Sequence, residues 1–123
     1  MTERPRIELV GVVLGAPDPR GLATFYEQLL GWPRRSDEEE WVTLRPVHGA
    51  GLSFQLEDQH ERPTWPHLPG TQQMQVHLDL QVDDLDVAST FAVSLGASVA
   101  EFQPQEDVRV HLDPAGHPFC LFL

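Results

Sequence analysis

The sequence predicts an α+β fold made of two tandem modules, each with the element order β-α-β-β-β. Residues 10–14 have the apolar, β-branched composition of a buried strand, and the same order of elements starts again at residue 74. A shift of 76 − 10 = 66 positions superposes helix starts, helix faces and strand ends: Val10 with Val76, Leu14 with Leu80, Asp18 with Asp84, Thr24 with Thr90 and Phe25 with Phe91. This repetition indicates a tandem duplication, in which two sheets pair and curve around a cavity.

A helix is expected over residues 18–30 of the first module. Asp18 is a suitable N-cap, Pro19 fits the first helical position, and Gly31 ends the segment. Apolar side chains recur on one face of this helix: Leu22, Phe25, Tyr26, Leu29 and Leu30. Short strands are expected at residues 41–44 and 52–56, joined by a turn.

The second module begins with a strand over residues 74–82, in which apolar side chains alternate with His77, Asp79 and Gln81. Asp83 or Asp84 caps a second helix, and Gly96 ends it. We expect the inward face of this helix to be formed by Ala88, Phe91, Ala92 and Leu95. Strands follow at residues 98–102, 108–112 and 119–123, with a tight turn over residues 113–116.

The chain of 123 residues is expected to form one domain over residues 1–123. Module one spans about 7–57, a linker about 58–73, and module two about 74–123. The linker contains three prolines and Trp65 but no apolar periodicity, so it is a long loop. Such a loop is either a mobile connector or a lid over the site.

Charge and cysteine content exclude several classes of function. The net charge is 8 − 19 = −11, and every basic residue is an arginine, so lysine Schiff-base and phosphate-loop chemistry are excluded. An acidic chain without a basic stripe is a poor partner for nucleic acid or an anionic membrane surface. The single cysteine, Cys120, excludes an intrachain disulfide and fits a reducing compartment, so we expect a cytoplasmic protein.

Three segments resemble the vicinal oxygen chelate superfamily, which includes glyoxalase I, bleomycin-resistance proteins and extradiol dioxygenases. They are residues 25–32 (FYEQLLGW), residues 77–85 (HLDLQVDDL) and residues 113–121 (DPAGHPFCL). The resemblance implies a U-shaped open barrel of paired modules with the ligand in its cleft. It also implies a homodimer.

Metal-dependent members of this superfamily carry a ligand on the first and last strand of each module. In this chain the four positions fall on Gly11, on Gln55 or Ser53 depending on how the turn is counted, on His77 and on Cys120. At most two of these residues are strong ligands, so we expect no bound metal and no cofactor. One alternative is that Glu57, on the same face as Gln55, joins His77 and Cys120 in a three-ligand site.

We expect a metal-free binding protein that sequesters an aromatic or antibiotic-like small molecule. The cleft residues expected to contact it are Trp41, Gln55, His77, Asp79, Cys120 and Phe122. Cys120 is interpreted as a small packing residue, because no basic neighbour would lower its pKa. The alternative function is a lyase, isomerase or dioxygenase that uses a nonstandard metal set, or His77 and Asp79 as an acid–base pair.

Overall fold

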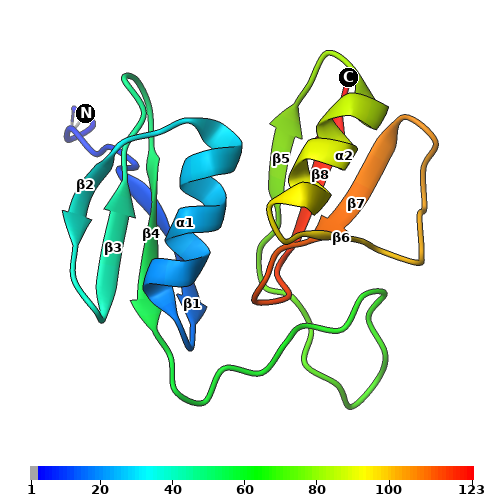
Figure 1. Cartoon of the computed structure of the whole chain (residues 1–123). Coiled ribbons are helices and arrows are strands. Elements are labelled where there is room, and N and C mark those ends of the chain that lie inside the picture. The colour runs from blue at the N-terminus through cyan, green and yellow to red at the C-terminus, as the bar shows by residue number, and fades with distance from the viewer. Residues whose placement is uncertain (1–2) are drawn as a thin grey trace.

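Two four-stranded sheets lie side by side in the computed structural model, which describes residues 3–123 (Figure 1). The strand orders are β1-β4-β3-β2 and β5-β8-β7-β6, so the modules have the same topology and the predicted fold class is confirmed. In sequence order the elements are β1 (Gly11–Ala16), α1 (Pro19–Leu30), β2 (Arg34–Asp37), β3 (Trp41–Leu44), β4 (Gly51–Leu56), β5 (Leu78–Gln81), α2 (Leu85–Ser94), β6 (Ser98–Val99), β7 (Val108–Leu112) and β8 (Pro118–Phe122). Over these residues the sheets do not close into a barrel.

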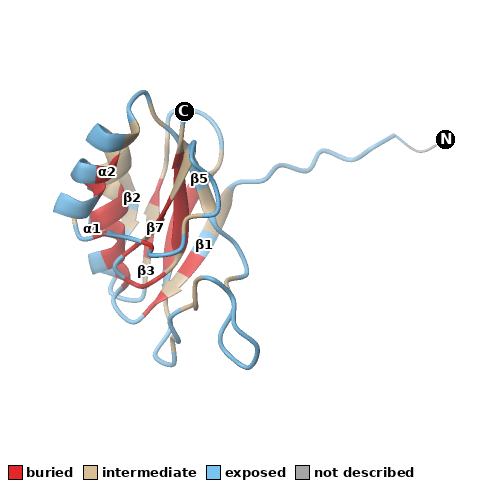
Figure 2. Ribbon diagram, turned by 90° about the vertical axis from the view of Figure 1, so that its right-hand side faces the viewer, coloured by how far each residue is buried: buried red, intermediate tan, exposed pale blue. Residues whose placement is uncertain are grey.

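Both helices cover the same side of the sheets and leave the opposite face open (Figure 2). The core between helices and sheets is shared by the modules, since the Phe25 ring of α1 lies 5.9 Å from the Phe119 ring of β8. Tyr26 stacks on Phe54 at 5.6 Å within the same core. No helix within residues 3–123 has the length and apolarity needed to cross a membrane.

Three of the four helix ends follow the capping residues that the sequence predicts, whereas the C-cap of α2 is Leu95 rather than Gly96. The Asp18 carboxylate accepts a hydrogen bond from the Gly21 amide at 3.1 Å, and Gly31 adopts a left-handed conformation with φ 72°. In the second module Asp84, rather than Asp83, caps α2 by accepting from the Val87 amide at 3.0 Å.

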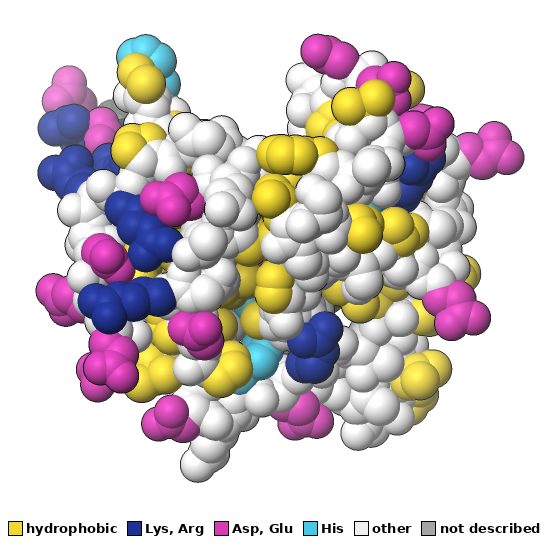
Figure 3. Space-filling view, in the orientation of Figure 1, with side chains coloured by type: hydrophobic (Ala, Val, Ile, Leu, Met, Phe, Trp, Pro, Cys, Tyr) yellow, Lys and Arg dark blue, Asp and Glu magenta, His cyan; other side chains and the backbone are white. Residues whose placement is uncertain are grey.

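The helix side of the molecule carries scattered acidic groups around a central band of hydrophobic side chains (Figure 3). Phe91 contributes exposed surface here: it is 47% exposed, so its assignment to the inward face of α2 was wrong. Ser89 and Ala92 face the sheet instead, and Phe91 is displaced from Ala92 by about 100° around the helix axis.

Three strand assignments also need correction. No strand was predicted for Arg34–Asp37, because its four polar residues lack an apolar alternation. β5 is limited to Leu78–Gln81 instead of 74–82, and β6 to Ser98–Val99 instead of 98–102. Short edge or terminal strands of this kind depend on pairing with a neighbour more than on their own composition.

The loop between the modules is anchored along the second module. His60 Nε2 lies 2.7 Å from the Ala115 carbonyl oxygen, and Trp65 Nε1 donates to the Phe102 carbonyl at 3.0 Å. The Trp65 ring packs against a small cluster that includes Val110 and Cys120. Trp65 therefore covers part of the open face of the second sheet, while motion of the loop as a lid stays a prediction.

Candidate functional site

The candidate site lies on the open face of the two sheets, opposite the helices. Successive side chains of a strand point to opposite faces of the sheet. A residue that is next in sequence to one packed against a helix therefore points to the open face. It includes Gly11 and Val13 of β1 beside Gly51 and Ser53 of β4, and Asp79 of β5 beside Cys120 of β8. Each sheet has a separate pocket on this face.

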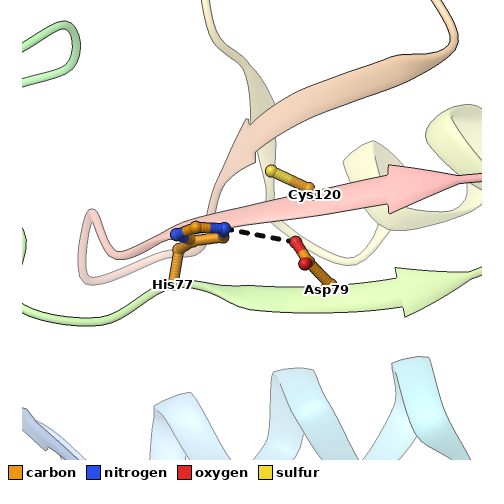
Figure 4. A group of neighbouring side chains, drawn as sticks. All are labelled: His77, Asp79 and Cys120. Carbon is orange, nitrogen blue, oxygen red and sulfur yellow. Dashed lines mark ion pairs between the residues drawn. The ribbon is translucent and has the colours of Figure 1, made fainter.

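The second-sheet pocket brings together four of the predicted site residues in a cavity of about 270 Å³. It is lined by His77, Asp79, Gln105, Val108, Cys120 and Phe122. His77 Nε2 lies 3.3 Å from Asp79 Oδ1, and Asp79 is the direct cross-strand partner of Cys120 (Figure 4). One donor atom from each of His77, Asp79 and Cys120 falls within 4.8 Å of the others.

The three groups differ in exposure and charge. The side chains of His77 and Asp79 are 41% and 61% exposed, whereas Cys120 is buried. Burial raises the pKa of the Cys120 thiol, and the Asp79 carboxylate raises it further through its charge and a hydrogen bond. Cys120 is therefore a protonated thiol at neutral pH rather than a nucleophile.

The first-sheet pocket is larger, with a volume of about 520 Å³, and contains one of the six residues expected to contact the ligand, Trp41. Its lining is Val10, Gly11, Val13, Arg35, Ser36, Trp41, Thr43, Arg45, Gly51 and Ser53. Gln55 is exposed and lines neither of these two pockets. Trp41 and Phe122, both expected to contact the ligand in one cleft, belong to different pockets.

The strand register identifies which residue of the first module corresponds to Cys120. Val13 pairs with Ser53 as Asp79 pairs with Cys120, and Val13 and Asp79 are equivalent by the 66-residue shift. Ser53 is therefore the counterpart of Cys120, and Gln55 is the counterpart of Phe122.

The four-ligand metal site of the superfamily does not fit this chain. The two first-module positions are Gly11, which has no side chain, and Ser53, whose hydroxyl lies 3.0 Å from the Thr43 hydroxyl. A neutral hydroxyl shared in this way is a poor substitute for a carboxylate or imidazole. Only the second module provides strong donors at these positions.

Glu57 does not complete a site with His77 and Cys120. Its carboxylate accepts from the Gln59 amide at 3.2 Å, and the donor cluster found among residues 3–123 contains Asp79 in its place. Three donors of this kind match the number that catalytic zinc sites use.

Several residues of the open face were not found from the sequence. Arg35 and Ser36 belong to β2, a strand that the sequence pattern did not predict, whereas Thr43 and Arg45 come from β3 and the turn after it. The signal that was available is Gly51, because a glycine inside a strand often marks a place where another group approaches the backbone closely.

Comparison with known proteins identifies the class. The model of the family described as "Glyoxalase-like domain" matches residues 11–122. The chain belongs to this family, within the vicinal oxygen chelate superfamily. No curated protein sequence matches the chain significantly.

Solved structures share the fold at low sequence identity. A glyoxalase/bleomycin resistance protein/dioxygenase family enzyme from Burkholderia phytofirmans PsJN is 18% identical with TM-score 0.73, covering 94% of this chain and 97% of its own. A glyoxalase/bleomycin resistance protein from Albidiferax ferrireducens T118 is 16% identical with TM-score 0.64, covering 93% and 96%. Lactoylglutathione lyase from Agrobacterium tumefaciens is 17% identical with TM-score 0.63, covering 97% and 95%. At these identities the likeness describes the fold alone.

Proposed function

We propose that the protein binds a small, flat aromatic molecule on its open face without a metal ion, and acts by sequestering it. The observation that carries this proposal is the first-sheet pocket beside Trp41, whose floor is the glycine pair Gly11 and Gly51. A volume of about 520 Å³ lies within the range of small-molecule sites. No side chain stands over Gly11, and the stem of Arg45 lies over Gly51, so the indole wall of Trp41 has room beside it for a planar ring.

Two of the four metal positions support the metal-free part of the proposal. Gly11 and Ser53 leave the first module without a strong ligand. The same two residues line the aromatic pocket, so the place where other members hold ligands to a metal is here part of the space for a small molecule.

The test is a titration with a panel of planar aromatic antibiotics, followed by tryptophan fluorescence in buffer with and without EDTA. We expect saturable quenching that EDTA does not change, and that Trp41→Phe removes. Trp32→Phe is the matched control, since Trp32 packs against the core on the helix side. Quenching that EDTA abolishes, or that survives in Trp41→Phe, contradicts the proposal.

The second candidate is an enzyme, and the cluster of His77, Asp79 and Cys120 favours it. These residues could hold a divalent ion in a nonstandard set, or His77 and Asp79 could transfer a proton as a pair. Metal analysis of the untagged protein tests the metal-dependent form of this second candidate. Stoichiometric zinc, nickel, manganese or iron that is lost in His77→Ala supports the enzyme.

We further propose a cytoplasmic homodimer. Support for a second copy comes from the extended segment before β1, where Ile7 and Leu9 are 75% and 74% exposed. Light scattering of the full chain and of a variant with both residues changed to serine tests it, and a wild-type monomer contradicts it.

A further inference from the structure

The first-sheet pocket has a charge opposite to that of the chain. The chain carries 19 acidic and 8 basic residues, yet the pocket lining includes Arg35 and Arg45 and no aspartate or glutamate. Positive groups at one concave place on an acidic protein create a local attraction for an anion.

A β-bulge aims Arg35 into this pocket. Arg34 pairs with Leu44, and Ser36 pairs with Thr43, so the register shifts at Arg35. Arg34 stays on the helix side, where its guanidinium donates to the Thr24 hydroxyl at 2.8 Å. The extra residue lets both Arg35 and Ser36 line the pocket, which regular alternation would prevent.

Gly51 makes room for Arg45. A Cβ atom built on Gly51 would lie 2.8 Å from Arg45 Cδ and would also collide with the Leu44 carbonyl oxygen. The stem of Arg45 therefore lies where a side chain at position 51 would be, and its guanidinium lines the same pocket as Trp41.

Both arginines are available to a ligand. Arg6, Arg20, Arg34 and Arg109 each form an ion pair with a carboxylate, and Arg62 donates to a backbone carbonyl oxygen. Among residues 3–123, the side chains of Arg35 and Arg45 have no ion-pair or hydrogen-bond partner.

A buried hydroxyl in the same lining points to a polar ligand group. Ser36 Oγ is shielded from water and has no hydrogen-bond partner within the described part of the chain. A buried polar atom without a partner is costly, and rotation of the Ser36 side chain about its Cα–Cβ bond toward the pocket would let a ligand oxygen satisfy it.

We infer that the ligand is an aromatic carboxylate, held by Arg35, Arg45 and the Ser36 hydroxyl through its acid group and by Trp41 through its ring. The inference rests on the proposed function and names the chemical class that the site selects. Guanidinium groups bind carboxylates by charge-assisted, often bidentate hydrogen bonds, which gives acid over amide selectivity.

The test compares 2-naphthoate with 2-naphthamide, which have the same ring and differ in charge, by isothermal titration calorimetry of the full chain. We expect the carboxylate to bind about ten- to a hundredfold more tightly than the amide, with an affinity that falls as salt rises. Arg35→Gln and Arg45→Gln should each remove most of this preference while amide binding changes little.

Arg109→Gln is the matched control, because it removes one positive charge on the helix side of the second sheet, where Arg109 pairs with Asp86. Circular dichroism confirms that each variant is folded. Equal binding of the two probes leaves the binding function in place and overturns the inference about the acid group. The inference is also overturned if Arg109→Gln lowers the preference as much as the pocket variants do. Binding of neither probe overturns the proposed function together with the inference.

Discussion

The Tyr26 hydroxyl donates a hydrogen bond of 2.7 Å to Asp113 Oδ2, and this buried contact joins α1 of the first module to the β7–β8 turn of the second. The same carboxylate accepts from the Ala115 and His117 amides at 2.9 and 3.0 Å. Burial, with the Asp113 charge and hydrogen bond, raises the pKa of Tyr26 well above its ordinary value. The modules are therefore linked by a polar contact inside a shared apolar core.

Removing this hydroxyl should destabilise the whole chain. Tyr26→Phe leaves the buried Asp113 carboxylate with one donor fewer, and we expect the free energy of unfolding to fall by about 1–3 kcal/mol. Urea denaturation followed by circular dichroism measures it, and both modules should unfold in one transition. A loss below about 0.5 kcal/mol, or two separate transitions, would show that the contact does not couple the modules.

His111 should make stability depend on pH. Its ring is buried, with Nε2 2.8 Å from the Ser89 hydroxyl oxygen, and burial lowers its pKa below the ordinary 6.5. Below about pH 6.5, His111 is protonated in the unfolded chain but stays neutral in the folded protein until a lower pH. The contribution of neutral, buried His111 to the free energy of unfolding is therefore present above that pH and is lost as the pH falls.

The measurement is the urea midpoint of unfolding between about pH 5 and pH 7.5. We expect His111→Gln to flatten the decline toward acid pH, whereas His48→Gln, in an exposed turn, leaves the slope unchanged. An identical slope in wild type and His111→Gln would assign the decline to other groups.

Cys120 should react slowly with thiol reagents. Its thiol is buried in the small cluster against which Trp65 packs, and its pKa is raised by burial and by Asp79. After EDTA treatment, Asp79→Asn should move the pH dependence of labelling by a chromogenic disulfide to lower pH, since it removes a charge that opposes the thiolate. Trp65→Ala should speed labelling about tenfold or more at every pH by exposing the thiol. Labelling of wild type at the rate of a free thiol contradicts this interpretation.

Restoring first-module ligands should create a metal site. A Cβ on Gly11 would meet the Gly51 carbonyl oxygen at 3.5 Å, an ordinary contact, so a side chain fits there. We expect Gly11→His combined with Ser53→Glu to bind Zn²⁺ at least about tenfold more tightly than wild type, because two strong donors then stand on the paired strands β1 and β4. Gln55→His, on the same strand as Ser53 but outside both pockets, is the control. An unchanged affinity in the double variant argues against the register-based equivalence.

Sequence patterns predicted the structural features that depend on residues close together in the sequence. The caps at Asp18 and Gly31 and the repeated topology follow from local chemistry and periodicity. The choice between Gln55 and Ser53 could not be made in this way, because it depends on strand register. The offset between equivalent residues of the two modules changes by one residue between the first strand and the last strand.

The first-sheet pocket was the largest feature that the sequence did not predict. Arg35 enters it through a bulge in a polar strand, and a bulge leaves no composition signature in a segment without alternation. The cluster around His77 was predictable in part, because His77 lies two residues before Asp79 in the segment that leads into β5, but the approach of Cys120 required the pairing of β5 with β8.

The glycine pair at positions 11 and 51 makes two kinds of occupant mutually exclusive. A histidine side chain at position 11 would occupy the space that the aromatic ring of the proposed ligand needs. Each gain in metal affinity at this position therefore comes with a loss of affinity for the aromatic ligand. The residue at position 11 thus decides whether this half of the molecule is suited to binding a metal ion or an organic ligand.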